Sequence, residues 1–475
     1  MTQTSSDTLS QPLSMALPWR VALAVTAGLL LTAGYALHPL WWAPWLAPIP
    51  LIVAASGSIA NARVAGILAG AIATVSVLGY YFGVAGGWIG VTIILILRTL
   101  SWHFAAVMTE RATRTLSPIL AVFVLPALIA ALELITLIVS VHGAAGSLAY
   151  SQMAMPGVIQ VAALGGVPAV VFIVLLPGSA LGIYLARGWR QTGLIPAATV
   201  CLLAIATVGY AGYRLAAPEP TKHVTATLIA TDRFKWIPDD WNAVWAAYGP
   251  SVASSARPGG LIVLPEKIAL LEHADADRAA QDISAAAKAS GVTIVAGIEV
   301  RDGKIYHNRS VVARSDGSVV WYTKQRLVPG FEGRDVPGKA PLFVEVAGGP
   351  LGVAICKDMH IPSIGQEYAG KTGIMAVSAW DFGEDGWMGA RMTAMRGVEG
   401  GYAIARSSRW GLVGAYDSRG RVIAEQASSK GMTVVTVAVP SERSDTPYTR
   451  IGDLFGYLCV LLTVALRGWF VFKRV

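Results

Sequence analysis

Gly352-Val-Ala-Ile-Cys356 is a short apolar run that ends in a thiol, and the fold of the chain is inferred outward from it. Short apolar runs bounded by turn signals are typical of buried β-strands. Two other runs also finish in a single reactive group: Leu261-Ile-Val-Leu-Pro-Glu266 ends in a carboxylate and Trp321-Tyr-Thr-Lys324 ends in an amine. We therefore predict three strands that each deliver one chemically active side chain at the strand end.

The region around these runs alternates short apolar stretches with more polar helical stretches. The predicted strands are residues 224–230, 260–264, 292–298, 310–313, 319–322, 351–355, 374–378 and 433–439. The predicted helices include residues 240–255, 274–290 and 389–399. Alternation of this kind predicts a layered α/β domain of about 225 residues, which we place at residues 221–446.

The chain before Pro218 has a different composition. Over the whole sequence 54% of residues are hydrophobic and 14% are charged, with a mean hydropathy of +0.55, whereas soluble domains carry about 25% charged residues. Between Val21 and Ala216 there are seven Arg, no Lys and two acidic residues. This composition excludes a purely soluble enzyme and a disordered chain, and it indicates a membrane half joined to a soluble half.

Apolar runs long enough to cross ~30 Å of hydrocarbon divide the membrane half into spans. Together with one run after the soluble domain, the predicted spans are residues 19–37, 43–60, 64–82, 87–108, 117–140, 164–186, 193–213 and 453–472. Prolines crowd the start of the second run, so a re-entrant segment is the alternative there. The sequence thus predicts a polar N-terminal tail at residues 1–18, a seven-span bundle at 19–216 and a closing span at 453–472, with no cleaved signal peptide.

The basic residues of the short connections fall on one side if all eight runs cross. They are Arg20, Arg63, Arg111, Arg114, Arg187, Arg190, Lys473 and Arg474. Because cytoplasmic loops carry an excess of Lys and Arg, we expect both termini in the cytoplasm and the soluble domain on the outer face. The same bias accounts for the net charge of +8 without nucleic-acid binding.

Three features of the membrane half each have two possible interpretations. Arg98 and Glu133 lie inside predicted spans, where an ion is either functional or part of a pair between helices. The uncharged outer loop at residues 143–157 either lies near a lipid substrate or is a simple connector.

Glu266, Lys324 and Cys356 together form a complete set of groups for acyl transfer. A thiolate is the nucleophile, a carboxylate can take the thiol proton, and an ammonium can stabilise the oxyanion that forms when the thiolate attacks a carbonyl. Taken singly, each residue has an ordinary structural interpretation as a solvated charge or a core cysteine. The set needs neither metal nor cofactor, and we predict none. The other two cysteines, Cys201 and Cys459, lie in apolar runs, so no disulfide framework is expected.

These residues and their contexts resemble the nitrilase superfamily, and the whole chain is similar to the apolipoprotein N-acyltransferase family of bacteria. The layout of seven spans, a nitrilase-like domain and a closing span is that family's. Local similarities are found in Pro126-Ala-Leu with Glu133, Ala149-Tyr-Ser-Gln152, Phe234-Lys-Trp236, Lys324-Gln-Arg-Leu-Val-Pro-Gly-Phe-Glu332, Met395-Arg-Gly-Val-Glu399 and Tyr416-Asp-Ser-Arg-Gly420. The resemblance implies an αββα nitrilase sandwich beside the membrane α-helical bundle.

The resemblance also implies a reaction in two steps. A fatty acyl chain moves from a membrane phospholipid, typically phosphatidylethanolamine, to Cys356 as a thioester, and then to the N-terminal α-amino group of a diacylated apolipoprotein. Glu266 would be general base and later acid, and Lys324 the oxyanion and positioning group. The supporting residues it implies are Glu332, Asp358, Trp236 and the backbone N–H of Lys357. The implied location is the bacterial inner membrane, with the catalytic domain on the periplasmic or outer face.

Some positions depart from the family pattern or carry open roles. Lys357 and Asp358 stand where the family usually has an aromatic residue and then Glu, and Ser378-Ala-Trp-Asp-Phe382 replaces a sequence like Asn-Asp-Ala-Trp-Phe. Exposed aromatic segments would dip into the bilayer interface or cover the active site as a lid. The candidate substrate-binding or lid residues are Tyr150, Ser151, Gln152, Phe331, Trp380, Phe382, Trp387 and Glu399.

Two other classes of function compete with acyl transfer. A membrane-anchored nitrilase-type amide hydrolase would use the same Glu, Lys and Cys, with water in place of the amine acceptor. A transporter or scaffold with an inactive domain is the non-catalytic alternative. Eight spans exceed what a simple tether needs, and the complete set of reactive groups argues against a decayed site.

Overall fold

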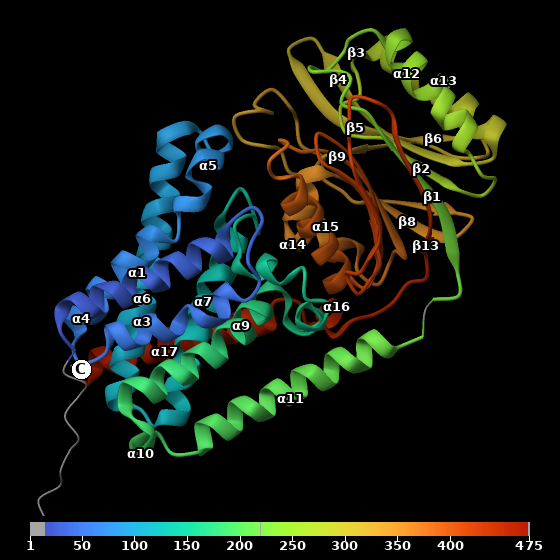
Figure 1. Ribbon diagram of the computed structural model, residues 1–475. Coiled ribbons are helices and arrows are strands. Elements are labelled where there is room, and N and C mark those ends of the chain that lie inside the picture. The colour runs from blue at the N-terminus through green and yellow to red at the C-terminus, as the bar shows by residue number, and fades with distance from the viewer. Residues whose placement is uncertain (1–14, 219, 474–475) are drawn as a thin grey trace, which may run out of the picture. The chain divides into compact units, whose positions relative to one another are not determined.

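The computed structural model describes residues 15–218 and 220–473 (Figure 1). The described chain forms two compact units. The first contains the residues up to Leu132, Val171–Ala206 and the residues from Tyr457 onward, and the second contains Glu133–Val170 and Thr207–Gly456. Most of the predicted N-terminal tail, residues 1–14, and the predicted cytoplasmic Arg474 lie outside the described residues.

Helices account for the membrane half. Their bounds are α1 Leu17–Tyr35, α2 Ala43–Leu46, α3 Pro48–Ala55, α4 Ile59–Ile72, η1 Val75–Val77, α5 Leu78–Val84, α6 Gly87–Thr115, α7 Pro118–Val139, η2 Leu148–Gln152, α8 Pro156–Ile159, α9 Ala162–Arg187, α10 Trp189–Thr192, α11 Ile195–Ala216 and, at the other end of the chain, α17 Leu454–Phe472. Within the described residues, seven helical segments are long and apolar enough to cross a membrane, with α4, η1 and α5 forming one of them. Each predicted span except the second coincides with one of these seven segments.

The second predicted span, residues 43–60, is shorter than expected and broken. It consists of α2 and α3, because prolines at 44, 48 and 50 favour helix starts and remove backbone donors. The segment nevertheless runs back along α1: the guanidinium of Arg20, near the start of α1, donates to the carbonyl oxygens of Ser56 at 2.6 Å and Ala54 at 3.1 Å. The chain therefore returns to the end where α1 begins, which a re-entrant segment would not do.

Arg98 of α6 lies beside the C-terminal end of α4, where the third predicted span is interrupted before η1 and α5. Its guanidinium donates to the carbonyl oxygen of Ala73 at 3.4 Å and lies 3.8 Å from the centroid of the Tyr35 ring. Ala73 is the C-terminal cap of α4, where carbonyl groups lack helical partners and a cation is favourable. This geometry supports the structural interpretation of Arg98. Glu133, in the second unit, accepts a hydrogen bond from the Leu148 N–H at 3.2 Å.

The second unit contains two β-sheets. The seven-stranded sheet has the order β13-β1-β2-β4-β5-β6, with β3 beside β4, and the six-stranded sheet has the order β12-β11-β10-β9-β8-β7. The strands are β1 His223–Ala230, β2 Leu261–Val263, β3 Leu270–Glu272, β4 Thr293–Asp302, β5 Ile305–Ala313, β6 Val319–Thr323, β7 Leu342–Val346, β8 Gly349–Ile355, β9 Ile374–Trp380, β10 Ala403–Arg409, β11 Leu412–Tyr416, β12 Val422–Ala427 and β13 Thr433–Pro440. All eight predicted strands are present; β3, β7, β10, β11 and β12 were not predicted.

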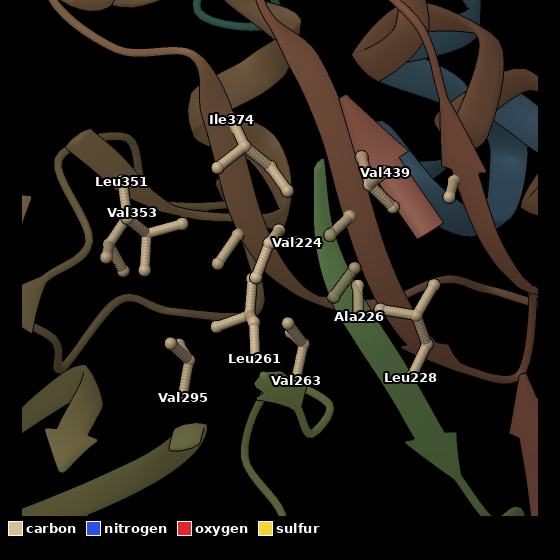
Figure 2. Close-up of a cluster of buried hydrophobic side chains, with 14 of the residues drawn as sticks. Val224, Ala226, Leu228, Leu261, Val263, Val295, Leu351, Val353, Ile374 and Val439 are labelled. Atoms are coloured by element: carbon tan, nitrogen blue, oxygen red, sulfur yellow. The ribbon is translucent and has the colours of Figure 1, made fainter. Parts of the chain in front are cut away.

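Helices cover the outer faces of both sheets. They are α12 Trp241–Ser255 and α13 His273–Ser290 on the seven-stranded sheet, α14 Pro362–Tyr368 and α15 Gly386–Gly400 on the other, with η3 Cys356–His360 after β8 and α16 Pro447–Ile451 before α17. The domain has one core between the sheets and another between the seven-stranded sheet and its helices. Successive side chains of β2 point into different cores: Leu261 and Val263 face the other sheet, and Ile262 faces α12 and α13. Figure 2 shows the core between the sheets. The predicted αββα sandwich is confirmed.

Small residues allow α4 and α6 to approach closely. A Cβ atom added at Gly66 would lie 2.5 Å from the His103 Cα, and one at Gly70 would lie 2.7 Å from the Thr99 Cα. The spacing Gly66-xxx-Gly70 is the pattern that brings membrane helices together.

We therefore predict that Gly66→Ala lowers the stability of the helical unit by about 1–3 kcal/mol, because the new methyl group meets backbone that cannot move away. Thermal unfolding in detergent measures this effect. Gly79→Ala in α5 is the matched control, since nothing lies within 4 Å of its added Cβ. Equal midpoints for the two variants would contradict the assigned packing.

Candidate active site

Three strand ends bring the predicted reactive groups into one site. Glu266 follows β2, Lys324 follows β6, and Cys356 begins the 3-10 turn η3 directly after β8. The Glu266 N–H donates to the carbonyl oxygen of Ala379 at 3.2 Å, which joins the loop after β2 to β9 of the other sheet. The site therefore lies between the sheets, and each of the three groups is at a strand end as predicted.

Lys324 is in contact with two carboxylates. Its Nζ donates to Glu266 Oε1 at 2.7 Å and to Glu332 Oε1 and Oε2 at 3.1 Å and 3.0 Å. Asn308 of β5, which the sequence did not single out, donates from Nδ2 to Glu266 Oε1 at 2.6 Å and Glu332 Oε1 at 2.7 Å. All four side chains are buried. One ammonium and one amide thus fix the positions of both carboxylates.

Electrostatics keep Lys324 and Glu332 ionised. Burial alone would lower the pKa of Lys324, but the carboxylates of Glu266 and Glu332 raise it well above its usual value. For Glu332, burial raises the pKa, yet Lys324, a second lysine at position 267 and hydrogen bonds bring it down to about 2. Lys324 is therefore an ammonium and Glu332 a carboxylate at neutral pH.

Cys356 is buried and adopts an unusual backbone conformation. Its φ of +43° lies in the left-handed region, which non-glycine residues rarely adopt except at functional sites. Its Sγ lies 3.6 Å from the Trp380 carbonyl oxygen. Burial and the charge of Glu266 raise the pKa of the thiol well above its usual value, against the opposing effect of Lys324. The resting group is a thiol, so attack requires a base at the moment of reaction.

Asp358 connects the cysteine turn to the lysine segment. Its Oδ1 accepts the N–H groups of Gln325 at 3.0 Å and Arg326 at 2.8 Å. Its Oδ2 accepts the Tyr322 hydroxyl at 2.8 Å and the Ile355 N–H at 3.0 Å. Burial raises the pKa of Asp358 to about 6 despite these donors. The shorter carboxylate therefore reaches its neighbours and fixes Cys356 relative to Lys324.

Lys357 is buried beside the nucleophile. Its Nζ donates to the Leu327 carbonyl oxygen at 2.8 Å, and burial and the nearby Lys324 lower its pKa to about 8. Its backbone N–H is at the start of η3, where the first donors of a helical turn have no partner within the turn. This position suits the predicted oxyanion donor.

The aromatic candidates divide into exposed and packed groups. Phe331 and Phe382 are both exposed, and their rings meet with centroids 4.9 Å apart. Trp236 is 74% exposed, with the Lys235 Nζ 5.5 Å from its ring. Trp380 and Trp387 are only partly exposed and lie against the guanidinium groups of Arg409 and Arg391. Phe331 and Phe382 remain lid candidates.

The outer-loop candidates are not at the surface. Tyr150, Ser151 and Gln152 are buried, and the Tyr150 hydroxyl accepts a hydrogen bond from Arg396 at 3.2 Å. Glu399 is buried as well: it pairs with Arg396 at 3.0 Å and accepts the Val167 N–H at 3.1 Å. The structure therefore shows structural contacts for Tyr150 and Glu399, and the role of these residues in binding substrate stays a prediction.

Within the described residues, no group of three or more His, Cys, Asp or Glu side chains is arranged to hold a metal ion. The chemistry of the site consists of a buried thiol, a carboxylate held by Lys324 and Asn308, and an ammonium near the thiol. A carboxylate can take the thiol proton and an ammonium can stabilise an oxyanion. The arrangement is competent for acyl transfer through a thioester.

The first comparison concerns the soluble domain and identifies the class of enzyme that it resembles. Residues 242–448 match the carbon-nitrogen hydrolase family. A carbon-nitrogen hydrolase superfamily protein of Xanthomonas campestris aligns with a TM-score of 0.40 and 18% identity over 45% of this chain and 90% of that chain. An amidase of Nesterenkonia aligns with a TM-score of 0.40 and 19% identity over 46% of this chain and 92% of that chain.

The match of the membrane half identifies a particular family within this class. Residues 27–180 match the apolipoprotein N-acyltransferase N-terminal domain. The apolipoprotein N-acyltransferase of Chromobacterium violaceum is 29% identical over 362 residues, 69% of this chain and 68% of that protein. The one of Vibrio vulnificus is 22% identical over 365 residues, 68% of this chain and 69% of that protein. The chain belongs to the apolipoprotein N-acyltransferase family of the nitrilase superfamily.

We predict that Asp358→Asn destabilises the α/β domain by about 1–3 kcal/mol and slows acyl transfer. Each carboxylate oxygen accepts at least one backbone N–H, so either orientation of the amide sets its NH₂ group against a donor. Denaturant unfolding and activity assays measure the two effects. Asp302→Asn, at an exposed position, is the control; an Asp358→Asn protein as stable and active as this control would contradict the role.

Proposed function

We propose that the chain transfers a fatty acyl group from a membrane phospholipid, through a thioester on Cys356, to the N-terminal α-amino group of a diacylglyceryl-cysteine apolipoprotein. The observation that carries the proposal is the buried contact between Glu266 and Lys324 next to a buried thiol. It occurs in a chain whose membrane and soluble parts both match families consistent with that reaction. These matches do not favour the amide hydrolase alternative.

The first step forms the thioester. Glu266 takes the proton from the Cys356 thiol as its sulfur attacks the ester carbonyl of the phospholipid. The ammonium of Lys324 and the backbone N–H of Lys357 stabilise the oxyanion. When the carbon-oxygen bond breaks, Glu266 returns its proton to the oxygen of the departing lysophospholipid. The buried environment strengthens each of these electrostatic interactions.

The second step resolves the thioester. The neutral α-amino group of the apolipoprotein attacks the thioester carbonyl, and Glu266 accepts the proton that the nitrogen loses. The carbon-sulfur bond breaks, and the sulfur of Cys356 takes the proton back from Glu266. The products are an amide and the free thiol, so the site returns to its starting state.

The membrane half serves the lipid substrates in this proposal. Exposing an acyl chain to water costs about 0.8 kcal/mol per CH₂ group, and an enzyme with membrane-spanning helices avoids that cost. We propose a tail at residues 1–18, a bundle at 19–216, a catalytic domain at 221–446 and a closing span at 453–472. The one-sided distribution of Lys and Arg supports cytoplasmic termini in a bacterial inner membrane, with the catalytic domain on its outer face.

Intact-protein mass spectrometry tests the proposal. After incubation with phosphatidylethanolamine, the purified chain gains a fatty-acyl mass that maps to Cys356, and a diacylated lipopeptide with a free N-terminus then removes it. Cys356→Ala forms no adduct, and Glu266→Gln forms it about 10²–10⁴-fold more slowly because the thiol loses its base.

Cys201→Ser is the control, since Cys201 is an exposed thiol of α11 and the variant keeps the full reaction. Turnover in Cys356→Ala would remove Cys356 from the mechanism. An adduct that decays to free fatty acid while the lipopeptide stays unmodified would make the chain a hydrolase.

A further inference from the structure

Lys267 is a second buried lysine that directly follows Glu266. Its Nζ lies 2.7 Å from Glu299 Oε1, 3.1 Å from Glu332 Oε1 and 4.0 Å from Asp335 Oδ1. The side chain is 8% exposed. Lysine is rarely buried unless it is paired, so these carboxylates account for its position.

The contact with Glu332 joins Lys267 to the reactive groups. Glu332 Oε1 also receives Lys324 Nζ at 3.1 Å and Asn308 Nδ2 at 2.7 Å. The charges therefore alternate through one buried network, from Glu266 through Lys324, Glu332 and Lys267 to Glu299. Coupling in such a network exceeds what separate pairs provide.

The backbone holds Lys267 in place. Its φ is +49°, and its carbonyl oxygen accepts a hydrogen bond from the Arg409 guanidinium at 3.2 Å. Gly297 of β4 lies under the same segment, since a Cβ there would be 2.6 Å from the Glu266 Cα and 3.0 Å from the Lys267 nitrogen. A strained conformation persists only where its surroundings enforce it, and here Arg409 and Gly297 hold the segment from which the lysine side chain contacts Glu332.

We propose that Lys267 is a positioning residue for acyl transfer: it holds Glu332 ionised and fixed, so that Lys324 stays in register with Glu266 and Cys356. This inference rests on the proposed function for the identity of the reaction, and on the contacts of Lys267 for the role. The charged groups that face Lys267 are Glu299 from β4, Glu332 and Asp335 from the loop after β6, and Glu266 beside it.

The pKa values agree with this role. Burial alone would lower the pKa of Lys267, but the surrounding carboxylates, Glu332 first, raise it. Lys267 in turn is one of the two lysines that lower the pKa of Glu332. Burial raises the pKa of Asp335 to about 6. Without Lys267, the carboxyl of Glu332 would take up a proton at a higher pH and release Lys324.

The alternative to a positioning role is that Lys267 serves only the stability of the fold. In that case Lys267 only neutralises the buried carboxylate of Glu299, and removing both charges together restores the protein, since buried pairs are often replaceable as a unit. The double variant Lys267→Met with Glu299→Gln separates the two roles. It leaves no unpaired Glu299 charge, but Glu332 still lacks its second cation.

The experiment uses the full chain in detergent with p-nitrophenyl butyrate, whose burst of p-nitrophenol reports acylation of Cys356 without any lipid substrate. The burst rate is measured from about pH 4 to pH 9. We expect Lys267→Met to be about tenfold slower at neutral pH, with its acid limb shifted up into the measured range, because the pKa of Glu332 rises from about 2 toward its usual value of 4.5 once Lys267 is lost. The double variant shows the same shift, and Lys304→Met at an exposed position matches the unsubstituted chain.

Two results would overturn the inference: a double variant with the rate and pH profile of the unsubstituted chain, or a Lys267→Met profile that does not move. If Lys267→Met does not fold, the double variant decides the question. A chain that gives the burst and the shifts but never acylates a lipopeptide would refute the proposed function and leave the role of Lys267 standing.

Discussion

The ammonium of Lys324 sits in the protein interior between the carboxylates of Glu266 and Glu332, at 2.7 Å from the first and 3.0 Å from the second. A buried charge costs several kcal/mol unless partners with good geometry replace its water. The surrounding fold provides that geometry, because the carboxylates follow β2 and β6 and Asn308 of β5 donates to both. The chemistry requires the same arrangement, since a base must stay unprotonated beside a thiol whose own pKa is raised.

Hydrogen bonds within the second unit fix Cys356 relative to the cluster of Glu266, Lys324 and Glu332. Asp358 joins the turn of the nucleophile to the lysine segment through four hydrogen bonds. On the other side of the turn, the Ala144 N–H donates to the His360 carbonyl oxygen at 2.9 Å, and Gly143 passes so close that a Cβ would lie 2.5 Å from that oxygen. The outer loop thus packs against the last residue of η3, the turn that begins at Cys356.

The sequence predicted the sandwich and its reactive strand ends because apolar runs on buried strands leave a clear pattern, and each run ended in one polar group. It missed β10, since Arg406, Ser407, Ser408 and Arg409 are polar in sequence but buried through ion pairs and hydrogen bonds. It missed Asn308 and Lys267 for a related reason: their roles arise from contacts between segments far apart in the chain. The outer loop was expected to lie near a lipid substrate or to be a connector; its residues Tyr150, Ser151 and Gln152 are buried, and Arg396 donates to the Tyr150 hydroxyl.

The central claim is that the Lys324 ammonium is needed for the reaction and not only for folding. Lys324→Met alone would leave Glu266 without its lysine partner and Glu332 with Lys267 as its remaining lysine partner, so the decisive protein is Lys324→Met with Glu332→Gln, which removes one charge of each sign. The measurement is the rate of acyl-enzyme formation at Cys356 from phosphatidylethanolamine, together with the unfolding midpoint. The account predicts a folded protein that acylates at least about 10²-fold more slowly; a folded double variant that acylates at the normal rate would contradict it.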